Sequence, residues 1–111
     1  MYGMNRDNRT PGWYSVREEI TQVVFNSSFS QARPTSTYAW FYEMVNISGI
    51  DGLGYLNTSQ VTNMQWMFGL CNNLTSLDVS KFDTSNVTNM YCMFYDCKSL
   101  SSLDVVGRAH V

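Results

Sequence analysis

The apolar positions of residues 58–79 recur with the same spacing in residues 84–105. The first segment reads TSQVTNMQWMFGLCNNLTSLDV and the second reads TSNVTNMYCMFYDCKSLSSLDV, so that 14 of the 22 aligned positions are identical at an offset of 84 − 58 = 26 residues. Identity this dense at one fixed offset, without a gap, indicates that the chain contains internal repeats.

A weaker form of the same period extends towards the N-terminus. An L-x-x-L-x-L-like pattern occurs four times at intervals of 26 or 27 residues. Such a period lies within the range of roughly 20–29 residues typical of leucine-rich repeats. The four copies are Ile20, Val23 and Phe25; Ile47, Ile50 and Gly52; Leu74, Leu77 and Val79; and Leu100, Leu103 and Val105.

Each repeat has two halves with different periodicities. The first half carries apolar residues at near-helical spacing, and Thr58 or Ser59 stands where a hydroxyl can cap a helix. The second half, LTSLDV, alternates near its end and predicts a short strand that pairs in parallel with its copies. The apolar stripes are Val61, Met64, Met67, Phe68 and Cys71 in one repeat, and Val87, Met90, Met93, Phe94 and Cys97 in the next.

These halves predict an α/β fold, a right-handed leucine-rich-repeat-like solenoid of about four rungs, each with a short helix and a short parallel strand. Phe68, Phe94, Leu77 and Leu103 are expected to be buried, with like positions in contact. The expected divisions are an N-terminal capping segment with the first strand (1–31), a degenerate repeat (32–57), a repeat (58–83) and a repeat with a truncated C-terminal end (84–111).

The string DTSNVTNMYCMFYDCKSLSSLDV (83–105) resembles the repeat of BspA-like leucine-rich-repeat bacterial surface proteins, also described as a mycoplasma-type domain of unknown function. The runs FNSSFSQARPTSTYAWF (25–41) and ISGIDGLGYLNTSQVTNM (47–64) resemble the opening segment of the same family. The resemblance implies a bacterial cell-surface protein that acts in adhesion or host-protein binding. It carries over no ligand-binding residues.

Charge and hydropathy narrow the classes of partner and location. Seven Lys and Arg against nine Asp and Glu give a net charge of −2, and the basic residues form no run, which argues against nucleic acid binding. No stretch approaches the roughly 20 apolar residues of a membrane span. The N-terminal segment lacks the apolar core of a signal peptide. We therefore expect a cell-surface or secreted protein if an export signal lies upstream, and a cytoplasmic one if Met1 is the native start.

The residue types argue against an enzyme and against a cofactor. His110 is the only histidine and stands one residue from the end of the chain. No glycine-rich phosphate loop or nucleophile elbow is present. A zinc site is not expected, because the three cysteines include no C-x-x-C pair and have no histidine nearby.

Cys71 and Cys97 occupy the same repeat position and are expected to be stacked neighbours. Buried, reduced thiols are the favoured interpretation, because cysteine behaves as a small apolar residue. A disulfide between them stays open as an alternative in an oxidising setting. Cys92 stands where Trp66 stands one repeat earlier and does not fit the ladder.

Asp51, Asp78 and Asp104 recur at offsets of 27 and 26 and should point away from the core, on the expected concave face. The favoured interpretation is that they bond to turns and hydroxyls, with Ser76 and Ser102 among the partners. The functional alternative is a mildly acidic binding face or a weak Ca²⁺ site.

Aromatic residues concentrate in the first half of the chain, where they are expected to close the open end of the stack. The alternative is that some of them form a binding hot spot. The cluster consists of Trp13, Tyr14, Tyr38, Trp40, Phe41 and Tyr42, and the candidate contact or capping residues are Trp13, Tyr14, Tyr38 and Trp40.

Together these features favour a non-enzymatic protein-binding or adhesion scaffold on a bacterial surface, with a host or extracellular matrix protein as partner. The alternative is a small intracellular interaction module, such as a mobile-element-borne inhibitor, with an intracellular target. Self-association through the C-terminal edge is also expected, because the sequence offers no further stripe after Val105 to cover it.

Overall fold

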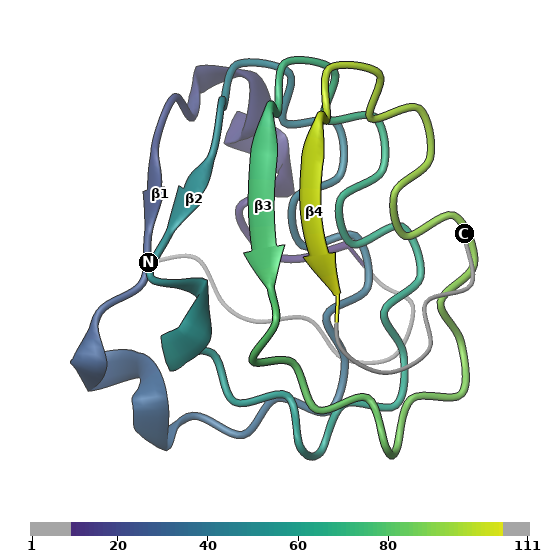
Figure 1. Ribbon diagram of the computed structural model, residues 1–111. Helices are drawn as coiled ribbons and strands as arrows, with labels where there is room; N and C mark the ends of the chain where they lie inside the picture. The colour runs from purple at the N-terminus through teal and green to yellow at the C-terminus, as the bar shows by residue number, and fades with distance from the viewer. Residues whose placement is uncertain (1–9, 106–111) are drawn as a thin grey trace.

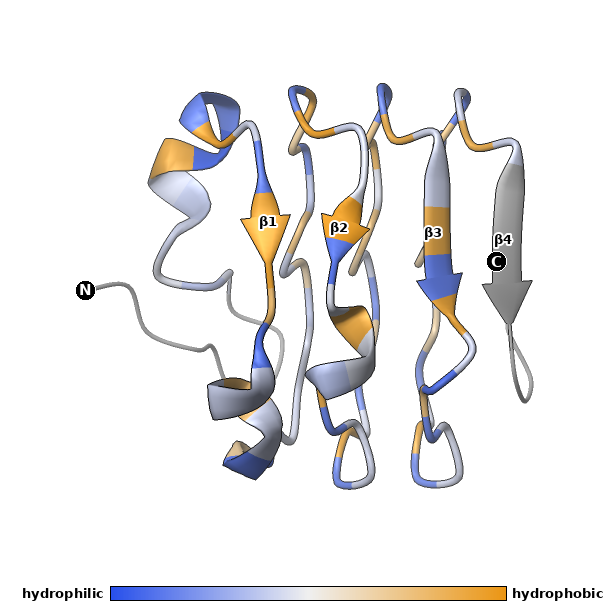
Figure 2. Ribbon diagram, turned by 60° about the vertical axis from the view of Figure 1, so that its left-hand side comes forward, coloured by the Kyte–Doolittle hydropathy of each residue, from blue (hydrophilic) through white to orange (hydrophobic). Residues whose placement is uncertain are grey.

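Four short strands pair in parallel in the computed structural model, which describes the backbone of residues 10–105 and the side chains of residues 10–101. Strand β1 (Val23–Val24) pairs with β2 (Ile50–Asp51), and β3 (Ser76–Val79) pairs with β4 (Ser102–Val105). The strands form two separate two-stranded sheets and lie side by side in chain order (Figures 1 and 2). The paired residues are 27 apart in the first sheet and 26 apart in the second, as in Val23–Ile50 and Leu77–Leu103.

The predicted fold class, an α/β leucine-rich-repeat-like solenoid with a helix in each rung, is wrong. The described residues contain no α-helix, and their helical segments are three short 3₁₀ helices. The strands are few and short, and the chain forms a compact globule with extents of 31 × 29 × 26 Å. The 3₁₀ helices are η1 (Tyr14–Glu19), η2 (Ser27–Gln31) and η3 (Leu53–Tyr55).

Three turn segments, residues 38–43, 65–70 and 91–96, stand where the repeat pattern predicted helices or their weaker counterpart. Each contains two non-glycine residues with a positive φ, four positions apart, and such residues do not continue an α-helix. These left-handed residues are Ala39 and Glu43, Trp66 and Leu70, and Cys92 and Asp96.

The backbone amides of a turn segment alternate between two kinds of acceptor. The amide of Met67 donates to the carbonyl of Met64 within its own turn, at 3.2 Å. The next amide, that of Phe68, donates at 2.9 Å to the carbonyl of Met93 in the following turn segment. An α-helix would keep these bonds within one segment. Here half of these backbone hydrogen bonds join neighbouring segments. The residues of the apolar stripe therefore form turns instead of a helix.

The apolar stripe is nevertheless the core of the molecule. Phe68 has 0% of its surface exposed and stacks on Phe41 and Phe94, with ring centroids 5.4 and 5.5 Å away. Leu77 is buried, as expected. Phe94 is only half-buried, contrary to expectation, because no described segment packs on its far face. The side chain of Leu103 lies outside the described residues.

Amide side chains bridge the neighbouring segments at recurring positions. Asn73 donates through Nδ2 to the carbonyl of Val45 at 2.6 Å, and Asn86 donates to the carbonyl of Ser59 at 2.8 Å. These bonds satisfy carbonyl groups that the turns leave without a partner in their own segment. Among the described residues, no helix is both long enough and apolar enough to cross a membrane.

Candidate functional site

A row of five aromatic side chains follows the turn segments and is the candidate site. Neighbouring rings lie in contact along the row, with centroids 6.1 Å apart for Tyr14 and Tyr42 and 5.4 Å apart for Tyr42 and Trp66. The ring of Trp66 then meets Tyr91 at 6.0 Å and Tyr95 at 5.5 Å, both edge to face. We call Tyr14, Tyr42, Trp66, Tyr91 and Tyr95 the aromatic row.

A glycine in the middle repeat makes the row continuous. Gly69 occupies the repeat position of Tyr42 and Tyr95, and it leaves a space that the Trp66 ring fills. A Cβ atom on Gly69 would lie 2.7 Å from Cε3 of Trp66 and 3.3 Å from Cδ1 of Tyr42. The glycine therefore lets one indole ring bridge the tyrosines of the neighbouring turn segments.

The two ends of the row differ in their contacts and in their exposure. At one end the Tyr14 hydroxyl donates to Oε1 of Glu43 at 2.5 Å, and the Arg17 guanidinium lies 4.0 Å from the Tyr14 ring. Burial, followed by the bond to Glu43, raises the pKa of Tyr14 to about 12. At the other end Tyr91 and Tyr95 are 62% and 53% exposed. The row is thus fixed at Tyr14 and open to a partner at Tyr91 and Tyr95.

The aromatic residues expected from the sequence have different environments. Trp40 is buried, and Trp13 donates through Nε1 to its carbonyl at 2.6 Å while the two rings pack edge to face at 5.4 Å. Trp13 and Trp40 therefore pack on each other at the N-terminal end of the core, and their role in closing that end stays a prediction. Tyr14 belongs to the aromatic row, and Tyr38 is half-buried beside Ser36, whose Oγ accepts a bond from the Tyr38 amide.

The acidic ladder is exposed and held in turns where it is described. Oδ1 of Asp78 accepts a bond from the Ser80 amide at 2.9 Å. Bonds from the Ser80 side chain and backbone hold the pKa of Asp78 below its usual value, with a smaller contribution from Lys81. Asp51 and Ser76 are also exposed. These contacts favour the turn interpretation for Asp78, with Ser80 as its partner.

The Ca²⁺ alternative gains no support from the described part of the chain. No three His, Cys, Asp or Glu side chains come together there in a group that could hold a metal ion. Ser102 and Asp104 pair through β4 with Ser76 and Asp78, and their side chains lie outside the described residues.

All three cysteines are free thiols. The Sγ atoms of Cys71 and Cys97 donate to the carbonyls of Phe41 and Phe68 respectively, each at 3.0 Å. Burial raises the pKa of Cys71 to about 12 and also raises the pKa of Cys97. Neither thiol is bridged in this geometry, and the low reactivity of the pair stays a prediction.

Thiol labelling of the native protein should follow the burial and the raised pKa values of the thiols, since Cys71 is buried, Cys92 and Cys97 are half-buried, and the pKa is raised for Cys71 and Cys97. At pH 8 a maleimide reagent should modify Cys92 first, Cys97 more slowly and Cys71 last, because the thiolate is the reactive form and a raised pKa lowers its fraction. Mass spectrometry of digested samples over time gives the three rates. Labelling of Cys71 as fast as Cys92, or a bridge between Cys71 and Cys97, would contradict the assignment.

Comparison with known proteins finds one family model, described as Mycoplasma protein of unknown function, DUF285, which matches residues 34–106. The match covers the three turn segments and therefore most of the aromatic row. Searches of curated proteins and of solved structures found no match.

Proposed function

The chain belongs to the DUF285 family of mycoplasma proteins of unknown function, and from this premise we propose that it is a non-enzymatic protein-binding module of a bacterial cell surface. The exposed end of the aromatic row, formed by Tyr91 and Tyr95, is the observation that carries the proposal. The resemblance of residues 83–105 to the BspA-like surface-protein repeat supports the adhesive role and the location at the surface.

The chemistry of the row suits a protein partner. Tyr and Trp are the residues most enriched at binding hot spots, because they offer a large apolar area and lose little rotational freedom. Tyr91 and Tyr95 leave more than half of their surface in water, although both rest on Trp66. A partner that covers them would bury apolar area on rings that already have a defined position.

Polar groups beside the row add the means to orient a partner. Asp96 is exposed and adjoins Tyr95 in the chain, and Asn72 donates through Nδ2 to the Asp96 carbonyl at 3.1 Å. An apolar centre with a polar rim is typical of protein interfaces. The Asp96 side chain can therefore accept bonds from a partner that covers Tyr95.

The proposal is tested by surface plasmon resonance of the full chain over immobilised fibronectin, fibrinogen and collagen. We expect saturable binding to at least one of them. The double variant Tyr91→Ser/Tyr95→Ser should weaken that binding about tenfold or more, since hot-spot side chains contribute upwards of roughly 1.4 kcal/mol. A purified globular protein such as ovalbumin serves as the negative surface.

Tyr55→Ser is the matched control, because Tyr55 is 46% exposed and lies outside the aromatic row, in η3. It should bind as the unchanged chain does. A folded chain that binds none of the three matrix proteins would contradict the adhesive function. If binding survives in Tyr91→Ser/Tyr95→Ser and is lost in Asp51→Asn/Asp78→Asn, the binding site lies on the strand face.

A further inference from the structure

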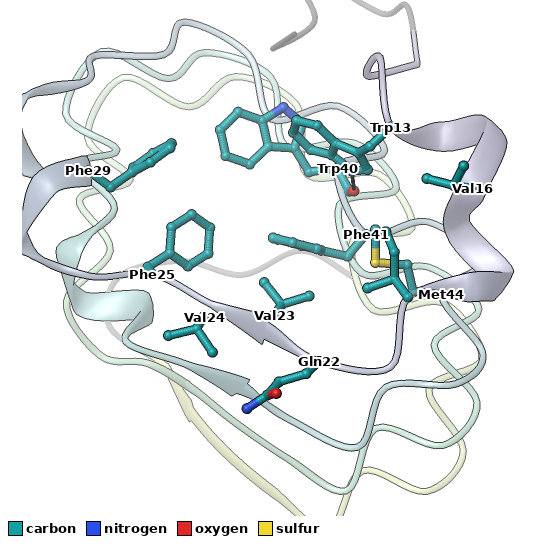
Figure 3. Close-up of a pocket in the computed structure, with 11 residues that line it drawn as sticks. Trp13, Val16, Gln22, Val23, Val24, Phe25, Phe29, Trp40, Phe41 and Met44 are labelled. Atoms are coloured by element: carbon teal, nitrogen blue, oxygen red, sulfur yellow. Dashed lines mark hydrogen bonds between the residues drawn. The ribbon is translucent and has the colours of Figure 1, made fainter. Parts of the chain in front are cut away.

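An apolar pocket of about 490 Å³ opens at the N-terminal end of the core, between η1, β1, η2 and the first turn segment (Figure 3). Its volume lies within the range of roughly 300–1,000 Å³ found for small-molecule sites. The lining residues are Trp13, Val16, Ile20, Gln22, Val23, Val24, Phe25, Phe29, Trp40, Phe41 and Met44.

The lining excludes a charged ligand. Among residues 10–105, Gln22 is the only polar side chain that lines the pocket apart from the Trp13 and Trp40 indoles, and the Trp13 Nε1 group already donates to the carbonyl of Trp40. No Asp, Glu, Lys or Arg of this described part of the chain lines the pocket. A charge placed there would lose its water without gaining a partner, which is costly. The ligand must therefore be uncharged.

The pocket walls are less buried than their counterparts deeper in the molecule. Ile20 and Val23 are half-buried, whereas the equivalent residues two repeats later, Leu74 and Leu77, are buried. At the mouth, Val24 is 57% exposed. A neighbouring segment covers Leu74 and Leu77. At the pocket, an apolar ligand would instead remove the apolar surface of Ile20 and Val23 from water.

The rings of the pocket favour a flat aromatic ligand. Trp13 and Trp40 meet at 75°, and Phe25 and Phe29 meet at 74° with centroids 5.0 Å apart. Five of the eleven lining residues are aromatic, so an inserted ring can meet a ring face or a ring edge among them. Both are arrangements that an inserted aromatic ring adopts with its neighbours.

We propose that this pocket binds an uncharged, flat aromatic small molecule. The site is separate from the aromatic row, and the proposal stands independently of the adhesive function. Gln22 lies at the edge of the pocket, and its amide points away from the aromatic rings (Figure 3).

The test is a fluorescence titration of the full chain with N-phenyl-1-naphthylamine, a neutral probe that brightens in apolar surroundings. Saturable binding with one site per chain is expected. Naphthalene should displace the probe, and 1-naphthoate, which has a similar ring system with a carboxylate, should need a concentration about tenfold higher or more. Equal displacement by the two competitors would overturn the proposal.

Val16→Trp places a large side chain in the pocket wall and should weaken probe binding about tenfold or more. Val45→Trp is the control, because Val45 is also half-buried and does not line the pocket. Thermal melts establish that both variants fold. Tyr91→Ser/Tyr95→Ser should leave probe binding unchanged, so that failure of this site is distinguishable from failure of the adhesive function.

Two results would refute the assignment. The first is a folded chain that shows no saturable binding, or binding that Val16→Trp does not change. The second is release of a dimer by the probe in light scattering, which would show that a second copy of the chain covers the pocket.

Discussion

Phe68→Ala is expected to lower the free energy of unfolding by about 3–5 kcal/mol, the range found when a buried phenylalanine is truncated. The side chain is fully buried, and its ring is stacked between those of Phe41 and Phe94. Truncation would leave a cavity that the two neighbouring rings cannot fill without leaving their own positions. Urea denaturation monitored by circular dichroism measures the change in the unfolding free energy.

Tyr95→Ala is the control for this loss, because it removes a large ring that is more than half exposed. We expect a cost below about 1 kcal/mol, since surface substitutions usually have small effects. Domains of this kind are stable by only about 5–15 kcal/mol, so Phe68→Ala brings the chain close to unfolding. Equal costs for the two variants would show that the phenylalanine stack is not the centre of the core.

Gly52→Ala should be as damaging, for a reason of backbone geometry. Gly52 has φ = 74°, where a side chain costs about 1–3 kcal/mol. A Cβ atom there would also lie 1.9 Å from the carbonyl oxygen of Phe25, a backbone atom that cannot move alone. We expect a fall in melting temperature of roughly 10 °C or more, since each kcal/mol shifts a domain of this size by about 4–8 °C. Differential scanning calorimetry gives the value.

Gly49→Ala provides the comparison, because the nearest atom to its added Cβ is the Ser76 carbonyl oxygen at 4.0 Å. This variant should melt within about 3 °C of the unchanged chain. Since Phe25 lines the apolar pocket, Gly52→Ala should also weaken binding of the naphthylamine probe. Identical melting of the two glycine variants would contradict the close approach of Gly52 to the backbone of Phe25.

The repeat pattern identified Phe68 and Leu77 correctly as buried, whereas Phe94 is half-buried and the predicted helices are absent from the described residues. Apolar residues at Val61, Met64 and Met67 are three apart, a spacing that fits one face of a helix and also fits successive three-residue turns. A helix and a series of turns differ in the carbonyl groups to which the backbone amides donate. In the turns, these carbonyl groups depend on the neighbouring segment. Trp66 and Leu70 adopt left-handed conformations without the glycine or asparagine that usually indicates them.

The aromatic row was missed for a related reason. On the expected helices, Tyr91 and Tyr95 would have belonged to an ordinary solvent-facing side, so no contact between them and Trp66 was predicted. One signal was present in the sequence, since the period aligns Gly69 with Tyr42 and Tyr95. A missing side chain between two aromatic positions indicates room for a ring from elsewhere in the segment.

The alternation of amide bonds in the turn segments makes hydrogen exchange a measure of folding cooperativity. Along residues 64–70, the even-numbered amides donate to the segment 89–95, whereas the amides of Met67 and Gly69 donate within their own turn. Deuterium would exchange into the even-numbered amides whenever the two segments separate. It would exchange into the amides of Met67 and Gly69 only when their own turn opens. Segments that detach one at a time would therefore give two exchange rates that alternate residue by residue, and a molecule that opens all at once would give one.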